Sequence, residues 1–372
     1  MKIGSNWRKI VALGAATALA ATLVLQAGPL VPAGAEGETV YSVGQVVQLS
    51  TENDLTKKIT DMEYGLKNQR AAYTPNGFSS WTGTYTYTIG PLIQSANTAL
   101  TNYQNTTNAN YTAEYSYYAA AYGLWLSGQS LQYQLANYNL ASHEKEITQL
   151  KLDQGTASQN DMMKAEISYN KAKADYLKAD YAYQQLLIST NLRMNTPLTQ
   201  QFNVNDVDLA FFSDDELAAG PLLNDLYLNH QSLVPLKQFV DAYQRAYEIA
   251  EGQTDPHIPI EGLMNYYALE KQEAQYRLQL AQKGVEKSIY EFSKELPVLQ
   301  AAIQLDQESA AKMSQVYENA AKRYEVGMST FDDMETVRLN LLQMQLQLAS
   351  DQQNYLLKKE KFRLFKAGAT FQ

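Results

Sequence analysis

The chain of 372 residues contains no cysteine and only three histidines, His143, His230 and His257. Without cysteine there is no disulfide, no thiol nucleophile and no thiol to acylate behind an export signal. The histidines are far apart and lack the spacing of metal ligands, so we expect all three at the surface. The sequence therefore predicts no metal site and no cofactor, and stability must come from packing.

Motifs of the common enzyme classes are also missing. No Gly-x-Ser-x-Gly nucleophile turn, phosphate-binding loop or paired-histidine metal motif occurs. The formal net charge is -9, so nucleic acid is not an expected partner. We predict a protein that is not an enzyme.

Long hydrophobic runs are absent, apart from one at the N-terminus. Basic residues precede the apolar run from Ile10 to Leu25, and Ala33-Gly34-Ala35 fits a cleavage site. The run is shorter than the roughly 20 residues that span a bilayer as a helix. We therefore expect residues 1–35 to be a secretory signal peptide, cleaved before Glu36.

A short turn occurs twice, as Gly155-Thr-Ala-Ser-Gln-Asn-Asp161 and as Gly327-Met-Ser-Thr-Phe-Asp-Asp333. Each glycine suits the left-handed position that ends a helix, and the Ser or Thr with the Asp supplies capping groups for the next helix. At the same offset, Met162 corresponds to Met334 and Tyr183 to Tyr355. The sequence therefore predicts a duplicated helix-turn-helix hairpin.

Each turn is followed by a long helical pattern. After the first turn, small and large residues alternate in steps of three and four along a seam formed by Ala165, Tyr169, Ala172, Tyr176, Ala179, Tyr183 and Leu186. After the second turn, the helix is apolar over two adjacent seams, so it should have neighbours on two sides. We expect these return helices over residues 158–193 and 329–366.

The rest of the chain repeats one plan. We expect an amphipathic helix over residues 45–72 and another over most of residues 215–252, and a long helix leading into each turn. Asn105-Thr-Thr-Asn108 is a candidate interruption of the first long helix. The best strand signal is Ser80 to Ile89, where threonine alternates with larger residues before Gly90-Pro91.

These patterns divide the chain into two repeats. A signal over residues 1–35 is followed by a first repeat over 36–195, which contains a short strand region at 75–91 and a turn at 153–160. An irregular linker over 196–214 leads to a second repeat over 215–366, with its turn at 325–332. A tail over 367–372 ends the chain.

This arrangement resembles the TolC family of outer-membrane efflux proteins. The most specific match is Tyr324-Glu-Val-Gly327 through Asp333, followed by Leu341, Ala349 and Tyr355, and the resemblance covers roughly residues 45–366. It implies a predominantly all-α fold, with duplicated long hairpins that build a TolC-like α-helical barrel as a homotrimer. It also implies a passive efflux channel of the cell envelope and outer membrane, working with a periplasmic adaptor (membrane fusion) protein and an inner-membrane efflux pump.

The resemblance further assigns roles to residues near the turns. The hairpin tips that would dock the adaptor are Gly155, Ser158, Gly327, Ser329 and Thr330. The channel entrance and gate would use Asp161, Tyr324 and Asp333, with Asp333 in a threefold carboxylate ring. Asp161 and Asp333 also suit capping of the return helices, and the two roles do not exclude each other.

Two features depart from the family pattern. The family has a basic residue where this chain has Ser329, which puts an ion-paired gate in doubt. The family also supplies four strands per chain, whereas only residues 80–89 suggest one here, so the family's β-barrel is either reduced or missing. The alternative function is a secreted structural coiled-coil protein of the cell surface. The polar residues between the seams, such as Gln343 and Gln347, favour the channel, which needs a water-facing side.

Overall fold

The computed structural model describes residues 39–53, 57, 89–205, 207, 209–252, 254 and 260–371. The expected signal over residues 1–35, and the expected strand from residue 80 to residue 88, lie outside the described residues. In chain order the elements are β1 Thr39–Ser42, α2 Val43–Asn53, α4 Gly90–Asn102, the π-helix η2 Tyr103–Asn108, α5 Ala109–Asp153, α6 Gln159–Met194, β2 Phe202–Asn205, α7 Asp214–Leu217, α8 Ala219–Leu226, the 3-10 helix η3 Gln231–Leu233, α9 Val234–Glu251, α10 Ile260–Glu325 and α11 Phe331–Ala367.

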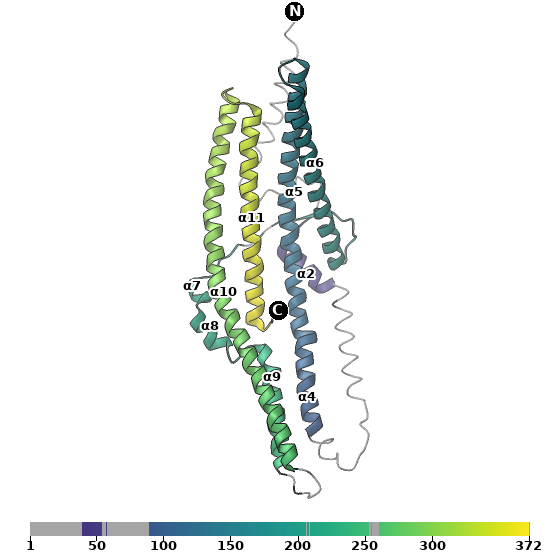
Figure 1. Cartoon of the computed structure of the whole chain (residues 1–372), viewed down its shortest axis with the longest axis vertical. Coiled ribbons are helices and arrows are strands. Elements are labelled where there is room, and N and C mark those ends of the chain that lie inside the picture. Colours follow the sequence, from purple (N-terminus) through teal and green to yellow (C-terminus); the bar gives the residue numbers. More distant parts are fainter. Residues whose placement is uncertain are drawn as a thin grey trace, which may run out of the picture.

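Four long helices form the body of the molecule and lie side by side (Figure 1). Helices α5 and α6 form hairpin 1, and helices α10 and α11 form hairpin 2. Helix α5 also packs along α11, so the order across the layer is α6, α5, α11, α10. The expected all-α fold of duplicated long hairpins is confirmed. In a single copy, α6 and α10 are the two outer edges of the layer.

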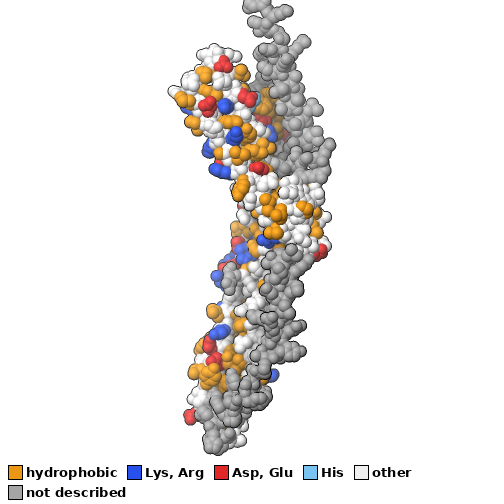
Figure 2. Space-filling model, turned by 90° about the vertical axis from the view of Figure 1, so that its right-hand side faces the viewer, with side chains coloured by type: hydrophobic (Ala, Val, Ile, Leu, Met, Phe, Trp, Pro, Cys, Tyr) orange, Lys and Arg blue, Asp and Glu red, His pale blue; other side chains and the backbone are white. Residues whose placement is uncertain are grey.

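The alternating seam of α6 makes the contact with α5. Ala172 and Tyr183 are buried in this interface. Tyr138 of α5 stacks on Tyr176 with ring centroids 5.7 Å apart, and lies 5.5 Å from the ring of Tyr169. Aromatic pairs at such distances stabilise a contact beyond the area that they bury. Figure 2 shows the side of the molecule that carries α6, where hydrophobic side chains are also present at the surface among charged ones.

Two tyrosines at equivalent positions of the return helices hold the segment between the hairpins. The Tyr183 hydroxyl donates to the carbonyl oxygen of Phe202 at 3.1 Å. The Tyr355 hydroxyl accepts from the backbone N–H of Phe212 at 3.2 Å and lies 3.3 Å from the carbonyl oxygen of Ala210. Both tyrosines are buried. The duplication therefore places two equivalent anchors against one connecting segment.

The largest hydrophobic core lies where this segment crosses the helices. Phe202 from the segment, Leu296 of α10 and Phe362 of α11 are fully buried there. The Phe362 ring contacts Phe212 and Phe292 with centroids 5.4 and 5.1 Å apart. Burying side chains of this size stabilises the fold by roughly 1.5–3 kcal/mol each. The hairpins are thus joined by a common core and not only by their seams.

The expectation of an irregular segment over residues 196–214 is wrong for Phe202–Asn205, which form strand β2. Strand β2 in this segment pairs in parallel with β1, in a register that places Thr39 opposite Phe202. The Phe202 and Val204 side chains are buried in the core. Strands of four residues are too short for their alternation to stand out in a sequence. The linker is therefore a structured part of the core.

Helices α4 and α9 and the first part of α10 extend the molecule beyond the end of α11 (Figure 1). The π-helix η2 joins α4 to α5, so the expected interruption at residues 105–108 remains helical. Ile89, the end of the expected strand, has helical backbone angles and precedes α4 directly. None of the described helices is both long enough and apolar enough to cross a membrane.

The π-helix also receives the residues that follow α11. The Tyr103 hydroxyl donates to the carbonyl oxygen of Gly368 at 2.7 Å, and the Thr370 backbone N–H donates to Asn108 Oδ1 at 2.7 Å. The residues expected as a tail therefore pack against the junction of α4 and α5.

One histidine is buried, so the expectation that all three lie at the surface is wrong for His230. The helix expected over most of residues 215–252 is divided into α7, α8, η3 and α9, and the His230 side chain caps η3. His230 is 2% exposed, with Nε2 2.8 Å from the Phe365 carbonyl oxygen and Nδ1 2.7 Å from the Ser232 hydroxyl. Burial lowers the pKa of His230. The neutral ring is accommodated because both nitrogens have partners. His143 is half-exposed, and His257 lies outside the described residues.

Candidate functional site at the hairpin tips

The two hairpin turns have the same backbone structure. Gly155 and Gly327 have φ of 71° and 74°, in the left-handed region. The Gly155 N–H donates to the Leu152 carbonyl and the Gly327 N–H to the Tyr324 carbonyl, both at 2.9 Å. The next N–H in each turn donates back five residues, to Lys151 or to Arg323. These bonds satisfy the last carbonyls of α5 and α10, and a side chain at either glycine would be strained.

A reciprocal cap begins each return helix. In hairpin 1 the Asp161 N–H donates to Ser158 Oγ at 3.2 Å, and the Ser158 N–H donates to Asp161 Oδ2 at 3.0 Å. Thr330 and Asp333 make the same bonds in hairpin 2, at 3.1 and 3.0 Å. The pKa of each aspartate is lowered, mostly by the hydrogen bond from the Ser158 or Thr330 hydroxyl and to a smaller extent by the bond from the backbone N–H of the same residue. The predicted capping role of Asp161 and Asp333 is confirmed.

The second tip presents an apolar surface. Val326 and Met328, on either side of Gly327, are among the most exposed large hydrophobic residues of the chain. The Ser329 hydroxyl, in contrast, is covered and has no hydrogen-bond partner. The exposed part of this tip therefore comprises Glu325 to Met328 and Thr330, whereas Ser329 offers no hydroxyl to a partner that approaches from outside.

The structure does not bring the predicted gate residues together within one copy. Asp161 lies on hairpin 1, whereas Tyr324 and Asp333 lie on hairpin 2. Tyr324 packs against Phe331 with ring centroids 6.0 Å apart. In the described part of the chain, no hydrogen bond or ion pair joins Asp161 to Tyr324 or to Asp333. A gate that used all three residues would need contacts between copies.

Hairpin 1 reaches further than hairpin 2, so the two tips are not level (Figure 1). His143 of α5 lies beside Asp332 at the start of α11. The residues from His143 to the end of α5 at Asp153 rise roughly 15 Å along the helix. Gly155 therefore extends beyond Gly327, and an object that meets one tip meets the other at a different depth.

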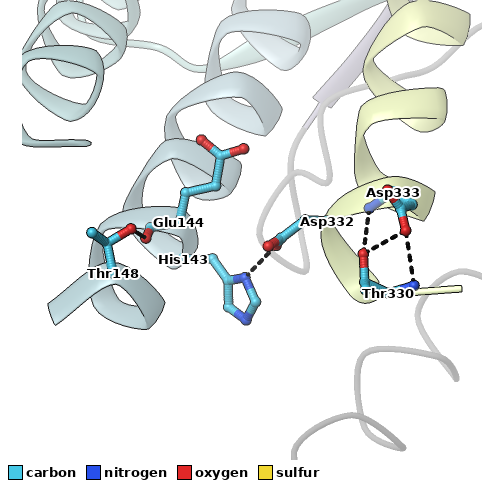
Figure 3. A network of polar contacts seen from close by, with 6 residues as sticks. All are labelled: His143, Glu144, Thr148, Thr330, Asp332 and Asp333. Carbon is cyan, nitrogen blue, oxygen red and sulfur yellow. Dashed lines mark hydrogen bonds and ion pairs between the residues drawn. The ribbon is translucent and has the colours of Figure 1, made fainter. Parts of the chain in front are cut away.

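A polar contact that sequence reasoning missed joins the hairpins at this level (Figure 3). His143 Nδ1 lies 3.1 Å from Asp332 Oδ1, and the His143 ring lies edge-on to Phe331 at 4.4 Å. Glu144 is beside them, and its pKa is raised by burial and then by the charge of Asp332. In the sequence, the only indication of this contact is that His143 precedes the first turn and that Asp332 follows the second turn, next to the capping Asp333.

The residues at the tips form two tight turns, two helix caps and one polar contact between the hairpins. Among the residues that the structure describes, no three His, Asp or Glu side chains converge as a metal site. The turns supply exposed glycine, small polar and apolar groups, and the caps fix the shape of each tip.

Replacing Thr330 with alanine should lower the free energy of unfolding by about 1 kcal/mol, because the Asp333 N–H loses its acceptor. Urea denaturation followed by circular dichroism measures this change. Thr330→Ser keeps the hydroxyl and is the matched control. Equal stability of the alanine and serine variants would show that the cap contributes nothing.

No protein-family model and no curated protein sequence matches the chain. Solved structures do match it, and they show that the fold is that of the TolC-type outer-membrane channels. The Campylobacter jejuni CmeC outer membrane channel is 12% identical, with a TM-score of 0.65 over 92% of this chain and 91% of that chain. The Vibrio cholerae outer membrane protein VceC is 12% identical, with a TM-score of 0.61 over 88% of this chain and 96% of that chain. CusC is 10% identical, with a TM-score of 0.60 over 92% of this chain and 98% of that chain.

Proposed function

We propose that three copies of this chain assemble into a TolC-type export channel, a passive conduit through the cell envelope. The observation that carries the proposal is a stripe of exposed hydrophobic residues along each outer edge of the helical layer. The channel fold of the solved neighbours supports it, because they are channels and not enzymes.

The stripe on α6 lies opposite the seam with α5. Its members are Met163, Ile167, Leu177, Tyr181, Ile188 and Leu192. At 3.6 residues per turn these positions fall on one face of the helix. Exposed hydrophobic residues scattered singly need no explanation, but a row of them along one exposed face of a helix marks an interface.

The stripe on α10 is at the opposite edge of the layer. Its members are Leu269, Tyr276, Leu280, Val298, Leu305 and Val316. These positions also share one face of their helix. The occupant that we propose for it is α6 of a second copy, because both edges of the layer are helices with a row of apolar side chains along one exposed face.

Contact between α6 of one copy and α10 of the next is head to tail, since the two surfaces differ. Such a contact repeats until the ring closes. The resemblance to the TolC family is the reason for proposing three copies in the ring, which gives a tube of twelve long helices. The hairpin tips would then gather at one end of the tube as its entrance.

We further propose that residues 1–35 direct export, that the repeats over 36–195 and 215–366 are the units of the tube, and that it belongs to the outer membrane and envelope. Its partners would be a periplasmic adaptor that docks at the tips and an inner-membrane pump. The exposed Val326, Gly327 and Met328 support docking at the second tip. At the first tip, Gly155 and Ser158 are exposed.

Replacing Leu305 with glutamate should convert the trimer to a monomer, because a charge would be buried in each α6–α10 contact. Light scattering of residues 36–372 measures the mass, and circular dichroism should show unchanged helix content. Gln304→Glu adds the same charge at the neighbouring exposed position, on another face of α10, and should leave the trimer intact. A trimer in the Leu305→Glu variant, or a monomer in the unmodified chain, would refute this assembly.

A further inference from the structure

We propose that His143 and Asp332 form a pH-dependent latch that holds hairpin 1 to hairpin 2 beside the entrance of the channel. The purpose of the latch rests on the proposed function. The contact itself lies within one copy, so its existence can be tested separately.

The latch joins elements that are far apart in the chain. His143 is on α5, about ten residues before the first turn, and Asp332 is in the first turn of α11. Their side chains are 36% and 35% exposed, so both protons and water reach them. The edge-on contact of Phe331 with the imidazole limits the positions that the ring can take. Figure 3 shows the two side chains pointing toward each other across the gap between the helices.

Both titratable groups at the latch change the link in the same direction. An imidazole becomes charged as the pH falls from about 8 to about 5. Glu144, beside His143 on α5, has a raised pKa through burial, then through Asp332, so it loses its negative charge earlier than an ordinary glutamate as the pH falls. Attraction between His143 and Asp332 therefore grows at acid pH while repulsion between Glu144 and Asp332 declines.

The other charged groups near the latch have partners of their own. On α11, Asp333 is held in its cap by Thr330, and Glu335 pairs with Arg338 at 2.7 Å. From α10, Tyr324 packs on Phe331, and Arg323 acts on the charge of Asp333. In the described residues, α6 contributes no ion pair to this network. His143, Glu144 and Asp332 are therefore the groups that meet between the two hairpins at this level.

The opposite end of the seam between α5 and α11 is held differently. There Arg363 of α11 pairs with Glu114 of α5. A guanidinium remains charged throughout the physiological range, so the cation of this link is permanent. The seam thus has a permanent link far from the tips and a titratable link near them. When the titratable link is lost, the tip of hairpin 1 is free to move away from hairpin 2, with the Arg363–Glu114 pair as the pivot.

The absence of cysteine makes the movement measurable. Gln154→Cys and Met328→Cys place two spin labels on exposed positions of the two tips. The full chain is assembled with an excess of unlabelled chain, so that each distance comes from one copy. Lowering the pH from about 8 to about 5.5 should reduce the population with widely separated tips about threefold. A change of this size is what the attraction within a half-exposed ion pair produces.

Two variants should abolish most of this pH response, His143→Gln and Asp332→Asn. Glu144→Gln should shift the population toward the latched form at pH 8, and Glu146→Gln, an exposed carboxylate nearby on α5, is the matched control. A pH response that persists in His143→Gln, or in Asp332→Asn, would overturn the latch. Absence of channel conductance with a normal pH response would instead refute the channel and leave the latch standing.

Discussion

Replacing Tyr355 with alanine should lower the free energy of unfolding by about 3–5 kcal/mol, the largest effect that we expect from one side chain. Tyr355 is fully buried where α11, α10 and the connecting segment meet. Its ring packs on Phe211 with centroids 5.2 Å apart. Removing the ring leaves a cavity in a core that joins both hairpins, so the loss should appear as a reduced midpoint in urea.

Tyr355→Phe separates the hydroxyl from the ring. The Phe212 N–H would lose its acceptor, and Gln300 Nε2 would lose a partner 3.3 Å away, so the loss should be about 1–2 kcal/mol. Tyr183→Phe is the matched comparison in hairpin 1. The Tyr183 hydroxyl donates toward two acceptors, the Phe202 carbonyl oxygen and Asn203 Oδ1, both at 3.1 Å. Its removal deprives acceptor oxygens of a donor but leaves no N–H without an acceptor, so the loss should be smaller. Equal losses in the two phenylalanine variants would contradict this account of the two anchors.

The caps and turns could be predicted because their contacts are local. Ser158 meets Asp161 and Thr330 meets Asp333 within one helical turn, and the glycines act on the residues just before them. Residue types three or four positions apart are enough to specify such bonds. The seam of α6 was predictable for the same reason, because the spacing of its alanines and tyrosines is set by the helix itself.

The contacts that were missed depend on how distant segments pack. His143 and Asp332 are 189 residues apart, and they meet only because hairpin 1 is displaced along hairpin 2. The repeat indicates which residues are equivalent, but not how far one hairpin slides past the other. His230 was misplaced at the surface because its partner, the Phe365 carbonyl, is 135 residues away. The pairing of β1 with β2 was missed because neither four-residue strand has a pattern of its own.

Replacing Arg363 with methionine should lower the free energy of unfolding by about 2–3 kcal/mol at neutral pH. Arg363 donates to Glu360 at 2.7 Å and pairs with Glu114 across the seam, and its guanidinium lies over the Tyr118 ring. Glu360 is 8% exposed, so methionine leaves a buried carboxylate without its cation. Because Arg363 itself is 45% exposed, we place the loss below that of a fully buried pair.

Arg338→Met is the matched comparison on the same helix. Arg338 pairs with Glu335 at the same spacing, and Glu335 is as buried as Glu360, but this pair makes no ion pair with α5 among the described residues. The difference between the two variants therefore measures what the link to Glu114 adds. A loss at Arg338 as large as that at Arg363 would show that the seam gains nothing from it.

The pH dependence of the Arg363→Met variant separates the effect of charge from that of packing. Without the guanidinium, burial disfavours the charged form of Glu360 in the folded chain relative to the unfolded chain. The folded state then binds more protons than the unfolded state over that pH range, so the variant should regain stability relative to the unmodified chain as the pH falls. Adding Glu360→Gln should restore most of the loss at neutral pH and remove this pH dependence. A loss that is independent of pH, and not relieved by Glu360→Gln, would mean that Arg363 acts through its contact with Tyr118 and not through its charge.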